Sequence, residues 1–484
     1  MNFNSLTFLC FFPLVLLLYC VIPKKLRPAL LLAASYLFYM SWNAKLVFLI
    51  LTTTAVSYFA GMIIEKYREK KILPALSLIV TLIVSLGFLF FFKYFNFVIS
   101  SFNSIAMAFG GEKTFSTLDL ILPVGISFYT FQTLSYVIDV YRGKIKAERN
   151  FFYYALFVSF FPQLVAGPIE RPDNLLPQLR EHRDPKADDI RDGLKLMAIG
   201  FFKKIVLADG VASAVNAVYN SPDGQSGFSV ILATLLFAVQ IYGDFSGYTD
   251  IAIGAARMLG IRLMKNFDRP YTAQSVKEFW DRWHISLSSW FRDYLYIPLG
   301  GNRKGKARKM LNVFIVFLVS GIWHGAAWTF VLWGALHGLY RLIEELFYKP
   351  LKKFAEKKGA GAVFLRRLIT FLLVTFAWIF FRANSVADLQ TLLGSLAGGW
   401  NADAISASLS SMGLGALSLC RIALSVSLLA VINRIMPDNT SSGEEKTAVS
   451  SSALTYVMLV MCVAVGWLML LEHHEASSFI YFQF

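Results

Sequence analysis

The sequence predicts an all-α protein that crosses a membrane several times. The chain of 484 residues is 56% hydrophobic and only 16% charged, and its mean hydropathy is +0.55. A soluble protein could not bury so much apolar surface in one core. The apolar residues form long runs near the roughly 20 residues that a helical span needs. Short alternating segments, which a membrane barrel would show, are not the pattern here.

The apolar runs indicate about eleven candidate transmembrane helices at roughly 20 residues each. The first five lie near 6 to 22, 28 to 42, 45 to 64, 73 to 98 and 119 to 140. The chain shows no internal repeat and no long linker, so we expect a single integral membrane domain over 1–484.

Charge placement predicts the orientation in the membrane. The formal net charge is +15, but the basic residues form short clusters at span ends, such as RKGKARK at 303 to 309. This is positive-inside patterning with attraction to anionic lipid, and we expect no nucleic-acid partner. KKLR (24 to 27) follows the first run, which puts the N-terminus outside. The loop after Arg382 has no Lys or Arg until Arg421, so that loop is expected outside. Two further crossings, at about 411 to 433 and about 453 to 471, then put the tail at 472–484 outside as well.

The middle of the chain differs from its ends. Between about 160 and 340, Pro, Gly and charged residues interrupt the apolar runs, as in FFPQLVAGPIERP and YGDFSGYTDIAIG. Broken backbone at membrane depth is tolerated only where protein or a water-filled cavity surrounds it. We therefore expect the middle to line a cavity and the terminal helices to surround it.

His324 is the first candidate catalytic residue. It lies in SGIWHGAAW between two apolar runs, and ionisable groups at membrane depth are costly enough to suggest a function. Gly321 and Gly325 permit close backbone approach, so we expect an imidazole that is open to a ligand. The alternative is a core histidine that is hydrogen-bonded to a neighbouring helix.

His284 is the second candidate. The aromatic and apolar residues around it recur every three or four positions, which predicts one amphipathic helix. Asp281 and Ser288 would share its face at i,i+3 and i,i+4 spacing, and they are candidate supporting residues. Asp281 could orient the imidazole or simply pair with a nearby base.

Two acidic residues in YGDFSGYTDIAIG complete the set. Asp244 and Asp250 could line an ion path or cap helix ends at a break, and Asp244 is a further candidate supporting residue. No metal site is expected, because His284 and His324 alone are too few ligands for zinc. A general base near neutral pH is the natural task for such histidines.

The motifs WHISLSSWFRDYLYIPLGGNR and SGIWHGAAW resemble those of the membrane-bound O-acyltransferase (MBOAT) family. The similarity is to its bacterial branch, which acetylates alginate or peptidoglycan or D-alanylates teichoic acid. The other segments that match this branch are LPVGISFYTFQTLSYVIDVYRG, FFPQLVAGPIERP, YGDFSGYTDIAIG and FFRA. The resemblance implies the MBOAT fold, in which transmembrane, re-entrant and interfacial helices surround a central funnel.

The resemblance also implies a function. His324 would be the essential histidine and His284 its partner. An acyl thioester, acetyl-CoA in our expectation, would enter from the cytoplasm, and no cofactor would be bound permanently. The acetyl group would reach a cell-surface or exported polysaccharide across the bacterial cytoplasmic (inner) membrane. The alternatives are transfer of D-alanine or another acyl group to a cell-wall polymer, and a non-catalytic acyl-donor channel or transporter.

The last eight residues, SSFIYFQF, fit the pattern F-x-Y-x-x-F through Phe479, Tyr481 and Phe484. This resembles the C-terminal motif of the accessory peptide in D-alanylation systems and makes Tyr481 a candidate acyl carrier. An SGNH-type transferase outside the membrane would then be the partner. Tyrosine has an unperturbed pKa near 10, so it would need His324 as a base. The alternatives are an interfacial aromatic anchor and a docking peptide.

Overall fold

The computed structural model describes residues 1–112, 114–165, 167–181, 183–347, 359–435 and 479–480. Within these ranges the regular structure is helical. The chain divides into two compact units, residues 1–197 with 251–264, and residues 198–250 with 265–484. The single integral membrane domain over 1–484 that the sequence indicates stays a prediction.

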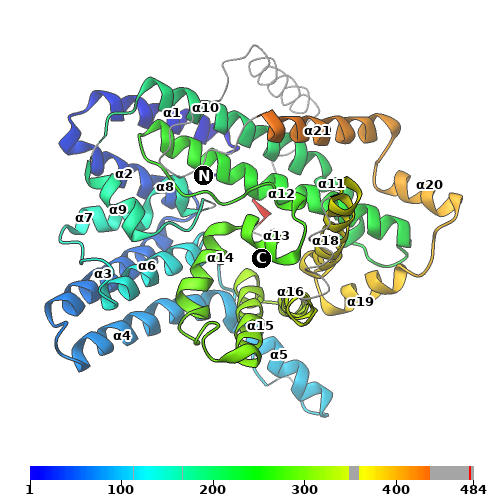
Figure 1. Ribbon diagram of the computed structural model, residues 1–484, viewed down its shortest axis with the longest axis horizontal. Coiled ribbons are helices and arrows are strands. Elements are labelled where there is room, and N and C mark those ends of the chain that lie inside the picture. The colour runs from blue at the N-terminus through cyan, green and yellow to red at the C-terminus, as the bar shows by residue number, and fades with distance from the viewer. Residues whose placement is uncertain (113, 166, 182, 348–358, 436–478, 481–484) are drawn as a thin grey trace. The chain divides into compact units, whose positions relative to one another are not determined.

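The first unit holds the α-helices α1 (Leu6–Val21), α2 (Arg27–Met40), α3 (Val47–Lys66), α4 (Ile72–Leu89), α5 (Phe95–Ala108), α6 (Ile126–Tyr141), α7 (Phe151–Ser159), α8 (Phe161–Leu164), α9 (Pro172–Glu181) and most of α10 (Ala187–Phe201). α1, α2 and α3 lie at the positions of the first three predicted apolar runs. α3 packs against both α4 and α6 (Figure 1). α6 begins later than expected because Gly125, its N-cap, takes a left-handed φ of 74°. A Cβ atom there would lie 2.7 Å from the carbonyl oxygen of Leu164.

The predicted break in FFPQLVAGPIERP is confirmed. α8 ends at Leu164 and α9 begins at Pro172. Between them the buried Glu170 accepts hydrogen bonds from the side chain of Asn174, at 2.7 Å, and from the backbone N–H of Met264. A buried carboxylate with two donors holds this loop in place.

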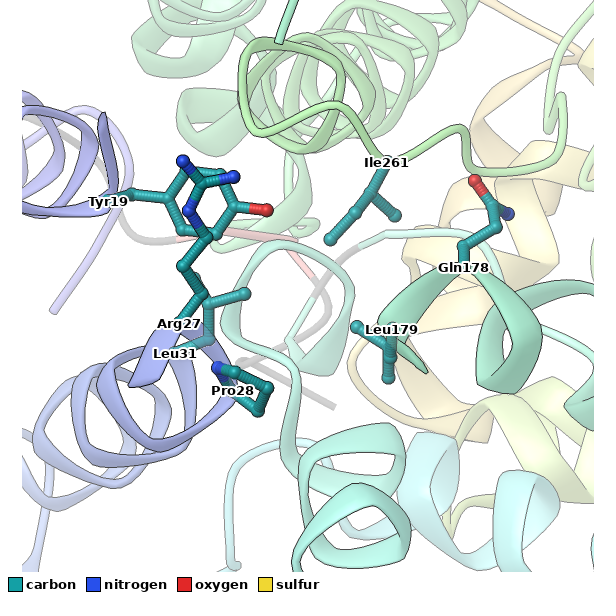
Figure 2. Close-up of a pocket in the computed structure, with 7 residues that line it drawn as sticks. All are labelled: Tyr19, Arg27, Pro28, Leu31, Gln178, Leu179 and Ile261. Atoms are coloured by element: carbon teal, nitrogen blue, oxygen red, sulfur yellow. The ribbon is translucent and has the colours of Figure 1, made fainter. Parts of the chain in front are cut away.

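A small pocket also lies within the first unit (Figure 2). Its lining residues are Tyr19, Arg27, Pro28, Leu31, Gln178, Leu179 and Ile261. The guanidinium of Arg27 lies 4.6 Å from the centre of the Tyr19 ring and pairs with Asp184 at 2.8 Å. Both contacts hold the arginine against the pocket wall.

The second unit holds the helices that carry the candidate site. They are η4 (Phe202–Asp209, a π-helix), α11 (Gly210–Tyr219), most of α12 (Gly227–Met258), η5 (Pro270–Thr272), α13 (Val276–Arg282), α14 (Ile285–Phe291), η6 (Arg292–Tyr296), α15 (Gly305–His324), α16 (Trp328–Leu346), α18 (Ala360–Arg382), α19 (Val386–Ser395), α20 (Ala402–Ser411) and α21 (Ala416–Ile435). α15 and α16 lie side by side, and α16 also packs against α18 (Figure 1).

Several helices could cross a membrane. Among the described residues, four are long and apolar enough: Ala44–Lys66, Ile72–Ala108, Gly227–Met258 and Ala360–Arg382. A fifth is present if the pair Ala402–Ser411 and Ala416–Ile432, bent by 77°, counts as one span. The chain is therefore a multi-pass membrane protein, and the expected count of about eleven spans is not confirmed.

The prediction of a helix break in YGDFSGYTDIAIG is wrong. This segment lies inside the continuous helix α12. Its glycines serve close packing rather than a break, because Cβ atoms at Gly243 and Gly247 would lie 2.9 and 2.7 Å from the carbonyl oxygens of Lys203 and Gly200. Asp244 is therefore an interior residue of a helix and not a cap.

Candidate active site

His284 lies between two short helices, and the single amphipathic helix predicted around it is interrupted there. α13 ends at Arg282 and α14 begins at Ile285. His284 itself has φ 45° and ψ 52°, a left-handed conformation that is uncommon for residues other than glycine and that costs energy. Strain of this kind persists only where surrounding contacts hold the residue in place.

Asn266 provides those contacts. Its carbonyl oxygen Oδ1 lies 3.0 Å from His284 Nδ1 and accepts hydrogen bonds from the backbone N–H and the hydroxyl of Ser286, at 3.3 and 2.8 Å. The backbone oxygen of Asn266 accepts the N–H of Ile285 at 2.9 Å. Asn266 could not be predicted as a site residue, because nothing in its local pattern distinguishes it from any polar residue in a loop.

This network assigns the tautomer of His284. A backbone N–H can only donate, so the Asn266 atom that Ser286 contacts is an acceptor, and His284 Nδ1 must carry the proton that it shares with that acceptor. His284 lies outside the candidate spans, and burial lowers the pKa of its imidazole to about 3. The ring is therefore neutral near pH 7, with its lone pair on Nε2.

His324 is the last residue of α15 and is only 2% exposed. Its ring makes edge contacts with Trp323, Trp333 and Phe381 at centroid distances of 4.9, 5.0 and 5.5 Å. The expected open imidazole is wrong, because aromatic side chains cover it. The expected close approach is confirmed, since a Cβ atom at Gly325 would clash with the ring of Phe330.

The fold brings the two predicted histidines together. The rings of His284 and His324 are 6.4 Å apart between centroids, and Trp323 contacts both, at 5.9 and 4.9 Å. Both histidines are buried. In such a low-dielectric setting, hydrogen bonds and charges interact more strongly than they do in water.

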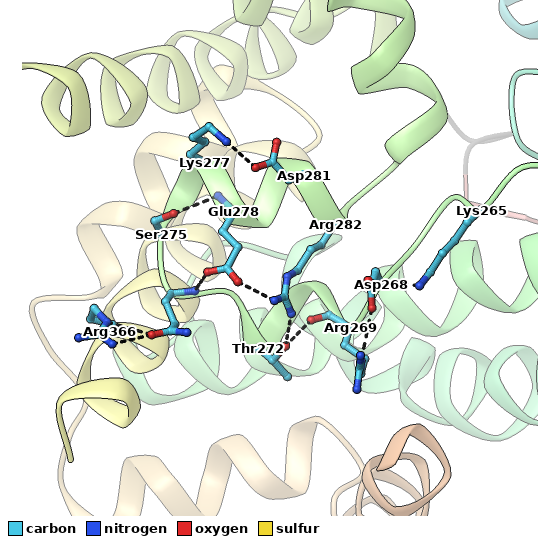
Figure 3. Close-up of polar contacts among 11 residues, drawn as sticks. Lys265, Asp268, Arg269, Thr272, Ser275, Lys277, Glu278, Asp281, Arg282 and Arg366 are labelled. Atoms are coloured by element: carbon cyan, nitrogen blue, oxygen red, sulfur yellow. Dashed lines mark hydrogen bonds and ion pairs between the residues drawn. The ribbon is translucent and has the colours of Figure 1, made fainter. Parts of the chain in front are cut away.

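The two residues predicted to support His284 have other partners. Asp281 pairs with Lys277 at 2.7 Å, and its side chain is 59% exposed (Figure 3). The Ser288 hydroxyl lies 3.4 Å from the backbone oxygen of Trp283. The helical spacing that linked both residues to His284 does not apply, because the helix is interrupted at His284.

His337 is a third buried histidine in this part of the unit. Its Nδ1 accepts the indole N–H of Trp280 at 3.2 Å, and its ring lies 4.9 Å from Trp333, which contacts His324. It therefore links α13 to the aromatic cluster around His324. Its position in the apolar run TFVLWGALHGLY was the only sequence signal.

Asp244 lies near the site and contacts the C-terminal tail. It is buried in α12 and pairs with Lys204 at 2.6 Å. It also accepts the backbone N–H of Ile480 at 2.7 Å. Phe479 is fully buried, and its ring centroid lies 5.7 Å from that of Phe245. The Phe245 ring centroid in turn lies 4.7 Å from that of His284. Tyr481 and Phe484, the other named residues of the tail motif, lie outside the described residues.

Comparison with known proteins matches residues 144–383 to the family model of MBOAT, the membrane-bound O-acyltransferase family. The chain is 40% identical to a probable alginate O-acetylase AlgI of Azotobacter vinelandii, over 88% of this chain and 84% of that protein. It is 37% identical to a probable alginate O-acetylase AlgI of Pseudomonas putida over the full length of both. It is 36% identical to a peptidoglycan O-acetyltransferase of Helicobacter pylori, over 76% of this chain and 73% of that protein.

Proposed function

The chain belongs to the membrane-bound O-acyltransferase family and is an acyltransferase, and from this premise we propose that it transfers acetyl groups to a polysaccharide. The donor is a cytoplasmic acetyl thioester, such as acetyl-CoA. The acceptor is a hydroxyl of a cell-surface or exported polysaccharide at the outer face of the bacterial cytoplasmic membrane. The names of the relatives support the acetyl group and the polymer class. The observation that carries the proposal is the buried pair of His284 and His324.

His324 acts as the general base in this proposal. It takes the proton of an acceptor hydroxyl as the oxygen attacks the thioester carbonyl carbon. The carbon–sulfur bond then breaks, and the leaving thiolate takes the proton back from the imidazolium. His284 stays neutral and positions or polarises the reacting groups. Asn266 holds its ring in a single tautomer.

Tyr481 is the first acceptor in the same proposal. Its hydroxyl oxygen would form an ester with the acetyl group, and an SGNH-type partner on the outer side would move that group to the polysaccharide. The preceding two residues support this path, because Phe479 packs on the ring that contacts His284. The channel alternative gains nothing from Asp244 and Asp250, since lysines pair with both carboxylates at 2.6 Å.

The test of catalysis replaces His324. His324→Ala and His324→Gln should each lower acetyl transfer by about 10²- to 10⁴-fold, because neither side chain can act as a base. Transfer of labelled acetyl groups from acetyl-CoA to cell-surface polymer measures this loss in variants that purify as stable, monodisperse proteins. A fully active and stable His324→Ala variant would rule out the catalytic role.

The carrier role is tested by mass spectrometry of the tail. After incubation with acetyl-CoA, the C-terminal peptide should carry an acetyl adduct on Tyr481 that hydroxylamine removes. Tyr481→Phe should lose both the adduct and polymer acetylation. If Tyr481→Phe were fully active, the tail would be an anchor or a docking peptide instead.

A further inference from the structure

The two carboxylate oxygens of Asp244 have different partners. Oδ1 pairs with the ammonium of Lys204 at 2.6 Å, and Oδ2 accepts the backbone N–H of Ile480 at 2.7 Å. The side chains of Asp244 and Lys204 are only 3% and 1% exposed. Lys204 also pairs with Asp209 at 2.8 Å. Burial of these charges is costly unless each is paired and hydrogen-bonded, so the tail N–H is part of what satisfies Asp244.

An apolar seat lies beside this carboxylate. The centroid of the Phe479 ring lies 4.6 Å from that of Tyr248 and 5.7 Å from that of Phe245, and Phe479 is fully buried. Asp244, Phe245 and Tyr248 are close together on α12, so one stretch of helix supplies both the polar and the apolar contact. Ile480, which is 4% exposed, is buried there as well.

The same helix carries a comparable ion pair that serves as a reference. Asp250 pairs with Lys203 at 2.6 Å, the same distance as between Asp244 and Lys204. Lys203 and Lys204 are neighbours in the π-helix η4, and short π-helical segments are frequent at functional sites. Of these two pairs, the one that includes Asp244 is hydrogen-bonded to the tail.

We propose that Asp244, together with the neighbouring Phe245 and Tyr248, is an intramolecular binding site for the chain's own C-terminal segment. Asp244, which is ion-paired with Lys204, binds the backbone N–H of Ile480, and the two rings bind Phe479. We call this site the tail anchor. The hydrogen bond to a backbone N–H holds the tail at one place along α12 and does not depend on the identity of the Ile480 side chain. The contacts with Phe245 and Tyr248 favour an aromatic residue at position 479. The tail anchor holds the two residues that precede Tyr481 in the chain, and its bearing on the carrier role of Tyr481 rests on the proposed function.

Hydrogen–deuterium exchange of the full chain in lipid nanodiscs tests the tail anchor directly, because the amide of Ile480 is the donor. Asp244→Ala should speed exchange of this amide by about 10- to 100-fold, the loss expected for a hydrogen bond to a charged group. Asp250→Ala is the matched control, since it removes the other carboxylate of α12, whose side chain is 18% exposed, and it should leave the rate within about twofold of wild type. Equal exchange in the two variants would overturn the proposal.

A second pair of variants covers the case in which Asp244→Ala does not fold. Asp244→Asn keeps an acceptor oxygen without its charge and should speed exchange by a smaller factor. Phe479→Ala changes only the tail and should also speed exchange, because the ring no longer fills its seat. An unchanged rate in both would equally count against the tail anchor.

The exchange measurement does not depend on catalysis. If Asp244→Ala releases the tail while Tyr481→Phe stays fully active, the tail anchor stands and the carrier role fails. If Tyr481 carries an acetyl adduct and exchange at Ile480 is the same in all variants, the carrier role stands and the tail anchor fails.

Discussion

The contact between Asn266 and His284 determines how the imidazole is oriented and which of its nitrogens carries the proton. A left-handed backbone at His284 costs about 1–3 kcal/mol, and the hydrogen bonds of Asn266 to His284, Ile285 and Ser286 hold it. The same oxygen determines which ring nitrogen carries the proton. One buried amide therefore sets both the orientation and the tautomer of the imidazole.

Replacement of Asn266 by Ala should lower the turnover rate by about 5- to 100-fold, because a buried hydrogen bond of 1–3 kcal/mol is lost. Asn266→Asp keeps an oxygen that accepts the Nδ1 proton and should recover much of the rate. Initial-rate kinetics with purified protein measure this difference.

Ser286→Ala is the control for that experiment, since it removes a neighbouring donor and leaves the contact between Asn266 and His284 in place. A purely structural role would make Asn266→Asp as inactive as Asn266→Ala. In that case the tautomer assignment would have no bearing on catalysis.

The pair of helices α15 and α16 is the element that presents His324. Gly321 and Gly334 face each other where these helices approach, and a Cβ atom at Gly321 would lie 3.1 Å from the Cα of Gly334. Small residues at helix crossings allow such close contact within membranes. The end of α15, with His324 as its last residue, is thereby held against α16 and the ring of Trp333.

Gly321→Ala should destabilise the protein by about 1–3 kcal/mol, because the added methyl group overpacks this crossing. We also expect a lower rate, since His324 is three residues further along α15. Thermal unfolding of the purified variant, followed by fluorescence, gives the change in stability.

Gly394→Ala, in α19, provides the comparison, because no atom lies within 4 Å of the Cβ position there. It should melt at or slightly above the wild-type temperature, as alanine favours helix over glycine. Equal melting temperatures for the two variants would show that the crossing tolerates a methyl group.

Orientation in the membrane is a property of the whole molecule, and basic clusters at span ends predict it. The cluster at 303–309, which includes the first turn of α15, is expected in the cytoplasm, and the loop after Arg382 is expected outside. Under this orientation the tail motif is also expected outside, on the side from which an external partner could collect the acetyl group.

Cysteine labelling of intact cells tests this orientation. In a variant whose four native cysteines are replaced, Ala397→Cys should react with a membrane-impermeant maleimide, and Lys304→Cys should react only after permeabilisation. Both positions are exposed in the structure. The reverse pattern would place the loop after Arg382 on the donor side and exclude the proposed route.

Apolar runs and short motifs predicted several features that the structure shows. The first three helices begin and end near the predicted runs, and the break in FFPQLVAGPIERP is present. The two histidines chosen by motif lie 6.4 Å apart between ring centroids. Local patterns were less reliable for helix continuity. Gly and Asp suggested a break in α12 that packing removes, and regular aromatic spacing suggested a helix through His284 that Asn266 interrupts.

The sequence by itself determined the helical membrane class, the family and the two candidate histidines, because hydropathy and motif spacing are local properties of the chain. Only the tertiary structure decided which groups hold those histidines and where the described part of the tail lies. Asn266 is 18 residues from His284, and Ile480 is 236 residues from Asp244. Contacts over such separations depend on how helices pack, and no local pattern records them.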